Sequence, residues 1–379
     1  MLAITRLTRL GLARGHPGRQ SRPRPVELKY KEFAMRCQRV TRLSLPGMLL
    51  ASSATLAAPA IPDKAGWSGH FNIGVGIGSS ESNMVASIFS QDLGSETVSS
   101  LDASPDDEDV ALPNLAFEVA YTLADMHTQL YLGNKAEDHL TFDVDTTLET
   151  HFGVRQGIPG VGVFDFSYAA SASPTDVWKD PYIVDAPRGD TERTSKGIHI
   201  EWDGIFDTGL QFMWSNREVE IDDERSGEDG TLGLTQREQR SLHRTGSIHR
   251  VEFHYSWAIN ENHRLVPGIG YLDHDLDGEA MADDGPFAQV QYIYTRNRWE
   301  VVSKLFYHDL ESGATNPIYG EQRDEETLGG SATVFYAEPF GLQRWTANAG
   351  VSFYEGDSNI DFYDSSFVMA TVGMLYRFD

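Results

Sequence analysis

The sequence predicts an all-β protein: a transmembrane, antiparallel, up-and-down β-barrel of about 14 strands, within a range of about 12 to 16, with long extracellular loops and short periplasmic turns. Apolar residues recur at every second position through much of the chain. Short turns alternate with long loops, and the chain begins with a segment typical of exported proteins. Residues 61–379 contain no apolar run of the roughly 20 residues that a spanning helix needs, so strands are the predicted membrane-crossing elements.

The alternation is clearest in the stretch HLTFDVDTTLETHFGV, residues 139–154. One face of this predicted strand carries Leu140, Phe142, Val144, Leu148, Phe152 and Val154. The other face carries Asp143, Asp145, Glu149 and His151. Shorter runs of the same kind occur at 67–77, 115–121, 164–168, 198–202, 210–214, 251–257, 265–271, 290–294, 332–336 and 345–353. A soluble β-sandwich or barrel shows the same period, but the strand length and the aromatic residues near the run ends favour a membrane barrel.

The connections separate the two ends of the predicted barrel. Short turns such as DGIFD and TRNR alternate with long loops. The long loops are predicted at 79–113, 171–195, 220–245, 273–285, 309–325 and 355–364. This places both chain ends on the periplasmic side, and the last strand must then pair with the first to leave no open edge in lipid.

The N-terminal region is predicted to be removed. Residues 35–60 have the parts of a secretory signal peptide: basic residues after Met35, a modest apolar run, and the cleavage pattern Ala58-Pro59-Ala60. Residues 1–34 are interpreted as an over-extended N-terminus, with an organelle transit peptide as the alternative, and residues 61–379 as the barrel. The only cysteine, Cys37, lies in the predicted signal peptide, so disulfides do not hold the barrel together.

Two stretches near the start of the barrel, WSGHFNIGVGIGSSESN (67–83) and SSLDASPDDEDVALPNLAFEVAYTL (99–123), resemble a family of Gram-negative outer-membrane proteins classified as a domain of unknown function. The resemblance covers residues 61–379 and implies the barrel and its location in the outer membrane. It brings no activity and no functional residues. The C-terminal stretch SSFVMATVGMLYRFD resembles the signal that the barrel-assembly machinery reads, but Asp379 follows the expected terminal aromatic, Phe378.

The faces opposite the apolar residues are predicted to line the lumen. The predicted lumen residues are Asp143, Asp145, Glu149, Asp165, Glu201, Arg217, Arg250, Glu252 and Lys304. A polar, roughly charge-balanced lining is typical of a water-filled pore. It is equally typical of a closed interior that is stiffened by ion pairs, and the sequence leaves both readings open.

The net charge is −25 overall, but residues 61–379 carry 20 Lys and Arg against 54 Asp and Glu, a net charge of −34. Residues 65–134 contain no Lys or Arg, and the first long loop is rich in acids. Such a mouth attracts cations and repels anions, although acidic runs often serve only solvation. The same charge argues against a nucleic-acid partner.

The most specific local pattern is DHDLDGEAMADD, residues 273–284. Asp273, Asp275, Asp277 and Asp284 stand at positions 1, 3, 5 and 12 of a calcium-binding loop, with Gly278 at position 6. Asp in place of Glu at position 12 and the flanking strands weaken the match. Calcium is therefore a candidate ligand, and the sequence predicts no other metal or cofactor.

The sequence predicts a porin-like channel for small hydrophilic solutes with a preference for cations, whose partners are membrane lipid, lipopolysaccharide, the assembly machinery and the solutes. One alternative is a transporter of hydrophobic ligands of the fatty-acid-uptake type, which requires an apolar pocket in the lumen. Another is a structural or adhesion barrel without a pore. No nucleophile elbow, HExxH motif or phosphate-binding loop occurs, so an enzyme is not predicted.

Overall fold

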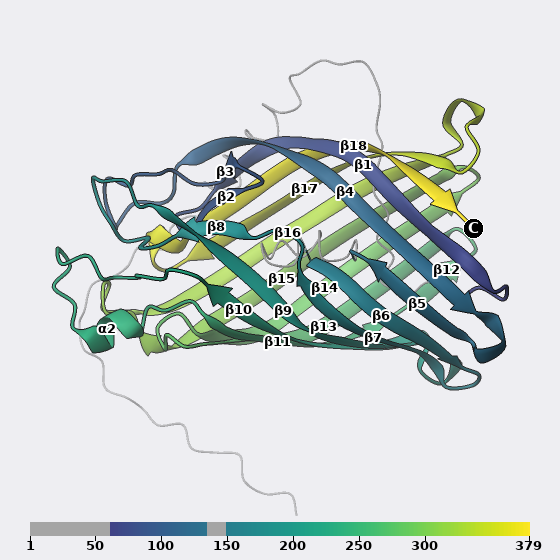
Figure 1. Ribbon diagram of the computed structural model, residues 1–379, viewed down its shortest axis with the longest axis horizontal. Helices are drawn as coiled ribbons and strands as arrows, with labels where there is room; N and C mark the ends of the chain where they lie inside the picture. Colours follow the sequence, from purple (N-terminus) through teal and green to yellow (C-terminus); the bar gives the residue numbers. More distant parts are fainter. Residues whose placement is uncertain (1–60, 135–148) are drawn as a thin grey trace, which may run out of the picture. The chain divides into compact units, whose positions relative to one another are not determined.

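The computed structural model describes residues 61–134 and 149–379. The predicted signal peptide (35–60) and the predicted lumen residues Asp143 and Asp145 lie outside the described residues. The wall of the molecule is a closed antiparallel barrel of 14 strands, as the sequence predicts (Figure 1). The wall strands are β1 (Gly66–Glu81), β4 (Asp107–Leu123), β5 (Thr128–Gly133), β6 (Glu149–Ile158), β7 (Gly162–Ser171), β9 (Asp190–Asp203), β10 (Leu210–Ile221), β11 (Gly246–Tyr255) with its continuation β12 (Trp257–Asn260), β13 (His263–Leu276), β14 (Asp283–Arg296), β15 (Trp299–Thr315), β16 (Gln322–Ala337), β17 (Trp345–Ser358) and β18 (Ser365–Phe378).

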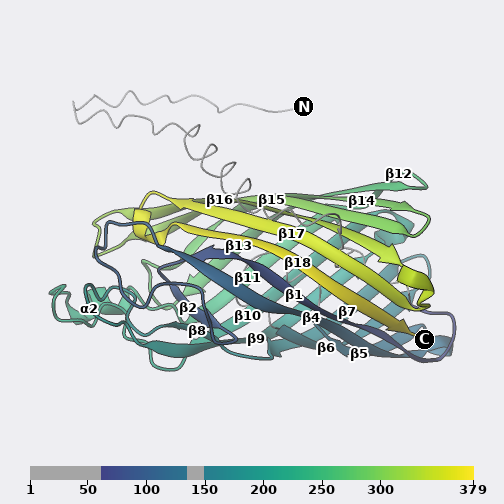
Figure 2. The same cartoon turned by 90° about the horizontal axis from the view of Figure 1, so that it is seen from above.

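The barrel closes through the first and last wall strands. Strand β18 pairs with β1 from Gly69 opposite Phe378 to Glu81 opposite Ser366, so the alternating C-terminal run completes the wall (Figure 2). Closure leaves neither strand with an unpaired edge, which is the condition for a sheet to cross a membrane. The C-terminus lies at the same end of the barrel as the short turns (Figure 1).

The two ends of the barrel differ in their connections. At the turn end, wall strands are joined by short segments that include the 3₁₀ turns η1 (Ala124–Met126), η4 (Ile205–Asp207) and η5 (Pro339–Gly341). At the loop end, the connections contain β2 (Val85–Ile88), β3 (Gln91–Asp92), β8 (Thr175–Trp178), the helix α2 (Gln236–Arg240) and the turn η6 (Asp361–Tyr363). Within the described residues, no helix is long and apolar enough to cross a membrane.

The outer face of the wall is apolar. Exposed side chains on this face include Ile73, Ile77, Leu115, Phe152, Phe166, Ile269, Leu305, Val351 and Val372. Near the turn end the belt is bordered by aromatic pairs, such as Trp67 with Tyr121 and Trp299 with Tyr336, whose ring centroids lie 5.1 and 4.6 Å apart. An apolar belt bordered by aromatic residues is the outer surface of a membrane-spanning barrel.

The strands reach further toward the loop end than the sequence predicts. Strands β15 and β16 leave a connection of only 316–321 where the sequence predicts a loop at 309–325, and β13 and β14 leave 277–282 where it predicts 273–285. These strand ends carry polar and acidic side chains on both faces, so hydrophobic alternation stops before the backbone pairing does.

Candidate functional site

The long loops pack together into a hydrophobic cluster, which we call the loop cap. Its buried residues are Val98, Tyr182, Leu242, Ala280, Met281, Ile360, Phe362 and Tyr363. Partly buried residues that pack against them include Met84, Leu101, Val184, Leu232, Leu234, Ile318 and Tyr319. These residues come from all six long connections that lie within the described residues. Burial of apolar surface is the main force that orders such loops, so packing of these side chains holds the six connections to one another.

Two buried tyrosine hydroxyls in the cap are hydrogen-bonded. The hydroxyl oxygens of Tyr182 and Tyr363 lie 2.7 Å apart, and Asn316 Nδ2 donates to the Tyr363 hydroxyl at 2.8 Å. Burial raises the pKa of both tyrosines above the ordinary value, so both stay neutral at physiological pH. The hydrogen bonds therefore join three loops that are distant in sequence and fix their relative orientation.

Arg188 ties the first long loop to the second described one. Its guanidinium donates to the carbonyl oxygens of Asn83, at 2.8 Å, and of Ser95 and Pro181, and lies 4.4 Å from the ring centroid of Trp178. Burial lowers the pKa of Arg188 to about 10, so the group remains protonated at neutral pH. A buried cation held by backbone carbonyls fixes the path of both loops, because any rearrangement leaves the charge without its acceptors.

A buried ion pair supports the same cap. Arg244 Nε lies 3.0 Å from Glu224 Oε1, and the backbone amides of Arg244 and Thr245 also donate to the Glu224 carboxylate. Burial opposes ionisation of Glu224, but Arg244 and these hydrogen bonds outweigh it and lower the pKa of Glu224 below its ordinary value of 4.5. The carboxylate therefore stabilises the folded cap in its ionised form.

We expect the cap to loosen in acid. A group whose folded pKa is lowered contributes stability above its unfolded pKa, and the contribution is lost as pH falls through the folded value. The amides of Arg244 and Thr245 should thus lose hydrogen-exchange protection, corrected for intrinsic rates, as pH falls below the ordinary glutamate pKa of 4.5. In Glu224→Gln the protection should be lower at pH 7 and nearly independent of pH. An identical pH profile in the wild type and in Glu224→Gln would contradict this assignment.

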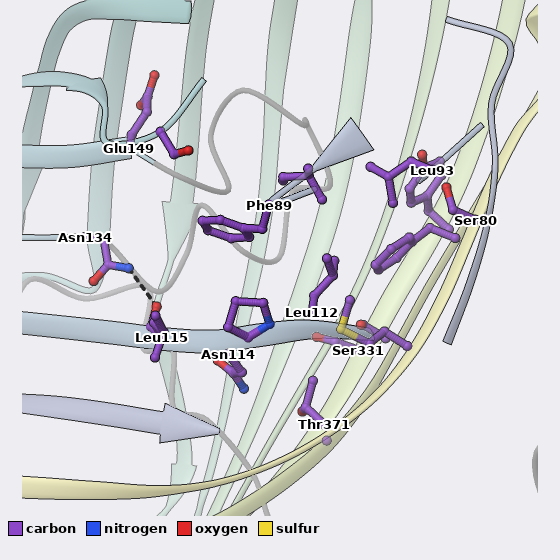
Figure 3. A pocket seen from close by; sticks show the side chains of 18 of the residues that line it. Ser80, Phe89, Leu93, Leu112, Asn114, Leu115, Asn134, Glu149, Ser331 and Thr371 are labelled. Carbon is purple, nitrogen blue, oxygen red and sulfur yellow. Dashed lines mark hydrogen bonds between the residues drawn. The ribbon is translucent and has the colours of Figure 1, made fainter. Parts of the chain in front are cut away.

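A cavity of about 390 Å³ lies between the first long loop and the inner face of the wall (Figure 3). The loop side contributes Val85, Ile88, Phe89 and Leu93, and Leu112 on β4 faces them from the wall. Ile88 and Leu93 also pack with Leu112 in one hydrophobic cluster, against which Phe367 and Met369 of β18 lie. Most of the cavity surface is therefore apolar, and its size falls in the range of small-molecule pockets.

The fold of the first long loop shapes this cavity. Strand β2 pairs with β3, where Ser87 stands opposite Asp92, and also with β8, where Val85 stands opposite Val177. After β3 the chain bends at Gly94, where a Cβ atom would lie 2.2 Å from the Ser82 carbonyl oxygen, so only glycine fits. As a result, Met84 and Val98 of this loop pack in the cap, whereas the segment from Val85 to Leu93 lines the cavity.

Six of the predicted lumen residues are buried among the wall strands. These are Glu149, Asp165, Glu201, Arg217, Glu252 and Lys304, and the side chain of Arg250 is partly buried. Their strand neighbours, such as Phe166 beside Asp165 and Phe253 beside Glu252, are exposed on the outer face. The structure therefore places all seven described residues of this set on the inner face, in separate groups. Their role in conduction stays a prediction.

The first group of inner-face residues surrounds Arg155. Its guanidinium lies 2.6 Å from Glu118 Oε2 and 3.3 Å from Asp165 Oδ2, and donates to Gln129 Oε1 at 2.9 Å. Tyr131 donates to Asp165 at 2.7 Å, and its ring lies beneath the guanidinium at 3.9 Å. Arg155 thus links β4, β5, β6 and β7 through one side chain.

Two further groups lie elsewhere on the inner face. Glu252 lies 3.1 Å from Arg250 Nε and 3.0 Å from His254 Nε2, and accepts from Gln289 at 2.9 Å. The other group lies on β6, β9 and β10, where Glu149 accepts from Ser195 Oγ at 2.7 Å and lies 3.6 Å from Arg217 Nη1. These contacts are what the ion-paired reading of the interior predicts, and they stiffen the wall between neighbouring strands.

The candidate calcium ligands occupy a β-hairpin. Asp273 and Asp275 lie on β13, Asp284 lies on β14 directly opposite Asp273, and Asp277 is in the connection between them. Tyr271 donates to the Asp284 carboxylate. Among the described residues, no three Asp, Glu or His side chains converge closely enough to hold a metal ion. Calcium binding stays a prediction.

Sequence reasoning missed the loop cap and the cavity. The signal for the cap was present: Tyr182, Leu242, Ile360, Phe362 and Tyr363 are apolar residues in segments that otherwise read as acidic loops. They lack the period-two spacing that marks a strand, so the sequence alone does not predict that they pack together. Phe89 and Leu93, which line the cavity, are of the same kind.

Comparisons with known proteins agree with the predicted family. The family model described as a protein of unknown function, DUF2860, matches residues 66–377. No curated protein matches the chain in sequence. Among solved structures, the chain is similar to the toluene transporter TodX of Pseudomonas putida, with 9% identity and a TM-score of 0.39 over 87% of this chain and 95% of that one.

Two other solved structures are similar at the same level. The anion-selective porin from Comamonas acidovorans has 7% identity and a TM-score of 0.38 over 83% of this chain and 100% of that one. The outer-membrane channel DcaP of Acinetobacter baumannii has 8% identity and a TM-score of 0.37 over 86% and 100%. Because the family match spans almost the entire barrel, this chain belongs to the DUF2860 family of proteins of unknown function.

Proposed function

We propose that this protein is an outer-membrane channel for small hydrophobic molecules, and that the loop cap closes it toward the cell exterior. One observation carries the proposal: the cavity on the inner side of the first long loop is lined mainly by apolar side chains, among them Ile88, Phe89, Leu93 and Leu112. A channel for ions and sugars has no use for such a surface, since apolar side chains at a water-filled passage are costly.

The position of the cavity supports the same proposal. The first long loop contributes Met84 and Val98 to the loop cap and Val85 to Leu93 to the cavity, so cavity and cap share one segment of chain. A molecule in the cavity therefore contacts the loop on which the closure depends. This is the arrangement expected of a ligand-specific transporter, in which the bound molecule and the closed mouth are coupled.

The location follows from the surface of the wall. The apolar outer belt and the closed strand edges suit a lipid bilayer, and the predicted signal peptide together with the β-barrel form suits the bacterial outer membrane. Lipid and lipopolysaccharide would contact the belt and the acidic loops. The assembly machinery would read β18, which ends at Phe378. No enzymatic activity is part of this proposal.

A second candidate is the porin-like channel for small hydrophilic, cation-leaning solutes. The charged inner face favours it, with Arg250, Glu252 and Lys304 on one part of the wall and Glu149 and Arg217 on another. The two candidates differ in what passes: the porin conducts ions when it is intact, and the hydrophobic channel does not. A barrel without any pore would neither conduct ions nor carry a hydrophobic probe.

Filling the cavity should block uptake of a hydrophobic probe. Ala172 lines the cavity, and Ala172→Trp places an indole in it. In cells whose only copy of the gene encodes Ala172→Trp, we expect the initial rate of N-phenyl-1-naphthylamine entry to be about tenfold lower than in cells with the wild-type gene, because the indole occupies the apolar volume. The measurement is probe fluorescence against time, with equal amounts of heat-modifiable barrel in the outer membrane as the condition for comparison.

The matched control is Ala258→Trp, which adds the same side chain at an exposed position on β12, near the turn end. Its uptake rate should equal that of the wild type. Equal rates in wild type, Ala172→Trp and a strain without the gene would refute the proposed function.

A further inference from the structure

We infer that the ligand of the cavity is an uncharged hydrophobic molecule and that carboxylates and other organic anions are rejected. This inference rests on the proposed function and adds the substrate class. It starts from what the cavity lacks: among the described residues that line it, none is Lys, Arg or His. An organic anion that enters such a cavity loses its hydration and finds no cation among the described lining residues to replace it, at a cost of several kcal/mol.

Glu149 is the one described lining residue that carries a carboxyl group. Its carboxylate already accepts from Ser195 Oγ at 2.7 Å and lies 3.6 Å from Arg217. The charge of Glu149 is thus balanced by side chains of β9 and β10, and a ligand cation has no unbalanced partner in the described lining. This argues for a neutral ligand over a cationic one.

The surroundings of the cavity repel anions as well. The first long loop and β4, which supply most of the apolar lining, belong to the stretch 65–134 without any Lys or Arg. Its acids include Asp92 on β3 and Glu108 on β4, on the two elements that enclose the cavity. A local field of one sign lowers the concentration of anions at the entrance, and it leaves neutral molecules unaffected.

The cavity offers hydroxyl groups along the wall side. Ser331 and Thr333 on β16, Ser352 on β17 and Thr371 on β18 line it on the wall side. Ser331 and Thr371 are labelled in Figure 3. Gly350 lies between two of them: a Cβ atom there would be 2.9 Å from Thr333 Oγ1 and 3.3 Å from Thr371 Oγ1. Neutral hydroxyls opposite an apolar face suit a hydrophobic molecule with one uncharged polar group, such as an alcohol, phenol or ketone.

The volume of the cavity limits the size of the ligand that it can hold. Its volume of about 390 Å³ exceeds the roughly 150 Å³ of an engineered apolar cavity that binds benzene. It therefore has room for two or three aromatic rings or for an alkyl chain of comparable volume. Two fluorescent probes of this size share one skeleton and differ by a single sulfonate group: uncharged N-phenyl-1-naphthylamine and anionic 1-anilinonaphthalene-8-sulfonate.

The test measures binding of both probes to the purified protein in nanodiscs of one zwitterionic phospholipid. The signal from empty nanodiscs is subtracted, and Ala172→Trp defines the part that arises in the cavity. We expect cavity binding of the uncharged probe to be at least about tenfold tighter than that of the anion, which corresponds to about 1.4 kcal/mol. Thr371→Lys should reverse the preference by supplying a cation, and Thr371→Gln, similar in size but neutral, should not.

The outcomes separate this inference from the proposed function. Equal cavity binding of both probes to the wild type would overturn the inference and leave the hydrophobic channel intact. Absence of cavity binding for either probe would overturn the proposed function. Failure of Thr371→Lys to bind the anion, in a barrel that remains heat-modifiable, would show that the missing cation is not the cause of selectivity.

Discussion

Phe362→Ala should open the loop end of the barrel and produce stepwise ionic current where the wild type is nearly silent. Phe362 is fully buried in the loop cap, and its ring centroid lies 5.6 Å from those of Tyr182 and Tyr363. Removing a buried Phe side chain costs about 3 to 5 kcal/mol. That loss falls on a small cluster of loops rather than on the wall, so the cap should separate while the barrel stays folded.

The measurement is planar-bilayer conductance in a salt gradient. The matched control is Phe340→Ala, which removes the same side chain from the turn end, where Phe340 is 90% exposed. It should leave the wild-type trace unchanged. The current through Phe362→Ala should be cation-selective, because the loops around the opening are acidic.

Large, steady current through the wild type, equal to that of Phe362→Ala, would show that the cap does not seal the mouth. In that case the porin-like channel becomes the better candidate, and the inner-face charges become its selectivity residues. Silence in both proteins would mean that a constriction below the cap closes the barrel.

Arg155→Met should destabilise the barrel by about 3 to 5 kcal/mol, because it leaves the buried carboxylate of Asp165 and the partly buried one of Glu118 without their cation. Arg155 contacts Glu118, Asp165 and Gln129 and is almost fully buried, so no solvent replaces the lost charge. The methionine has nearly the same length, and the change therefore tests charge and hydrogen bonding more than volume. Urea unfolding, followed by loss of heat-modifiable migration, measures the effect.

The matched control is Arg225→Met. Arg225 also forms an ion pair, with Asp223 at 2.9 Å, but its side chain is exposed at the loop end. Exposed pairs contribute little to stability, so the unfolding midpoint should stay near that of the wild type. Equal midpoints for Arg155→Met and Arg225→Met would show that water reaches Arg155 and that the inner face there is hydrated.

Much of the wall could be predicted from residues alone. The run from Val368 to Phe378 predicts a closing strand, and β18 pairs with β1 over that stretch. Leu305 and Ile269 mark outer-face positions, and Glu252 and Lys304 mark inner-face positions, because side chains in a strand alternate between two solvents. A period of two is a local property, so it survives in the sequence without knowledge of any partner strand.

The loop cap and the cavity could not be predicted in the same way. Tyr182 and Tyr363 are 181 residues apart, and Ile88 meets Phe367 only because the barrel brings β18 beside β1. The same holds for Asp273 and Asp284, which match a calcium loop in sequence but lie on paired strands. Spacing along the chain says nothing about side chains that different loops bring to one place.

The sequence by itself determined the barrel, its strand number, its two faces and its family, because each depends on local alternation or on extended similarity. The tertiary structure alone decided that the loops at the loop end pack into one cluster and that an apolar cavity lies behind the first loop. The physical reason is that loops have no period: their apolar residues gain stability only by mutual burial, and which residues meet depends on the closed wall that positions them.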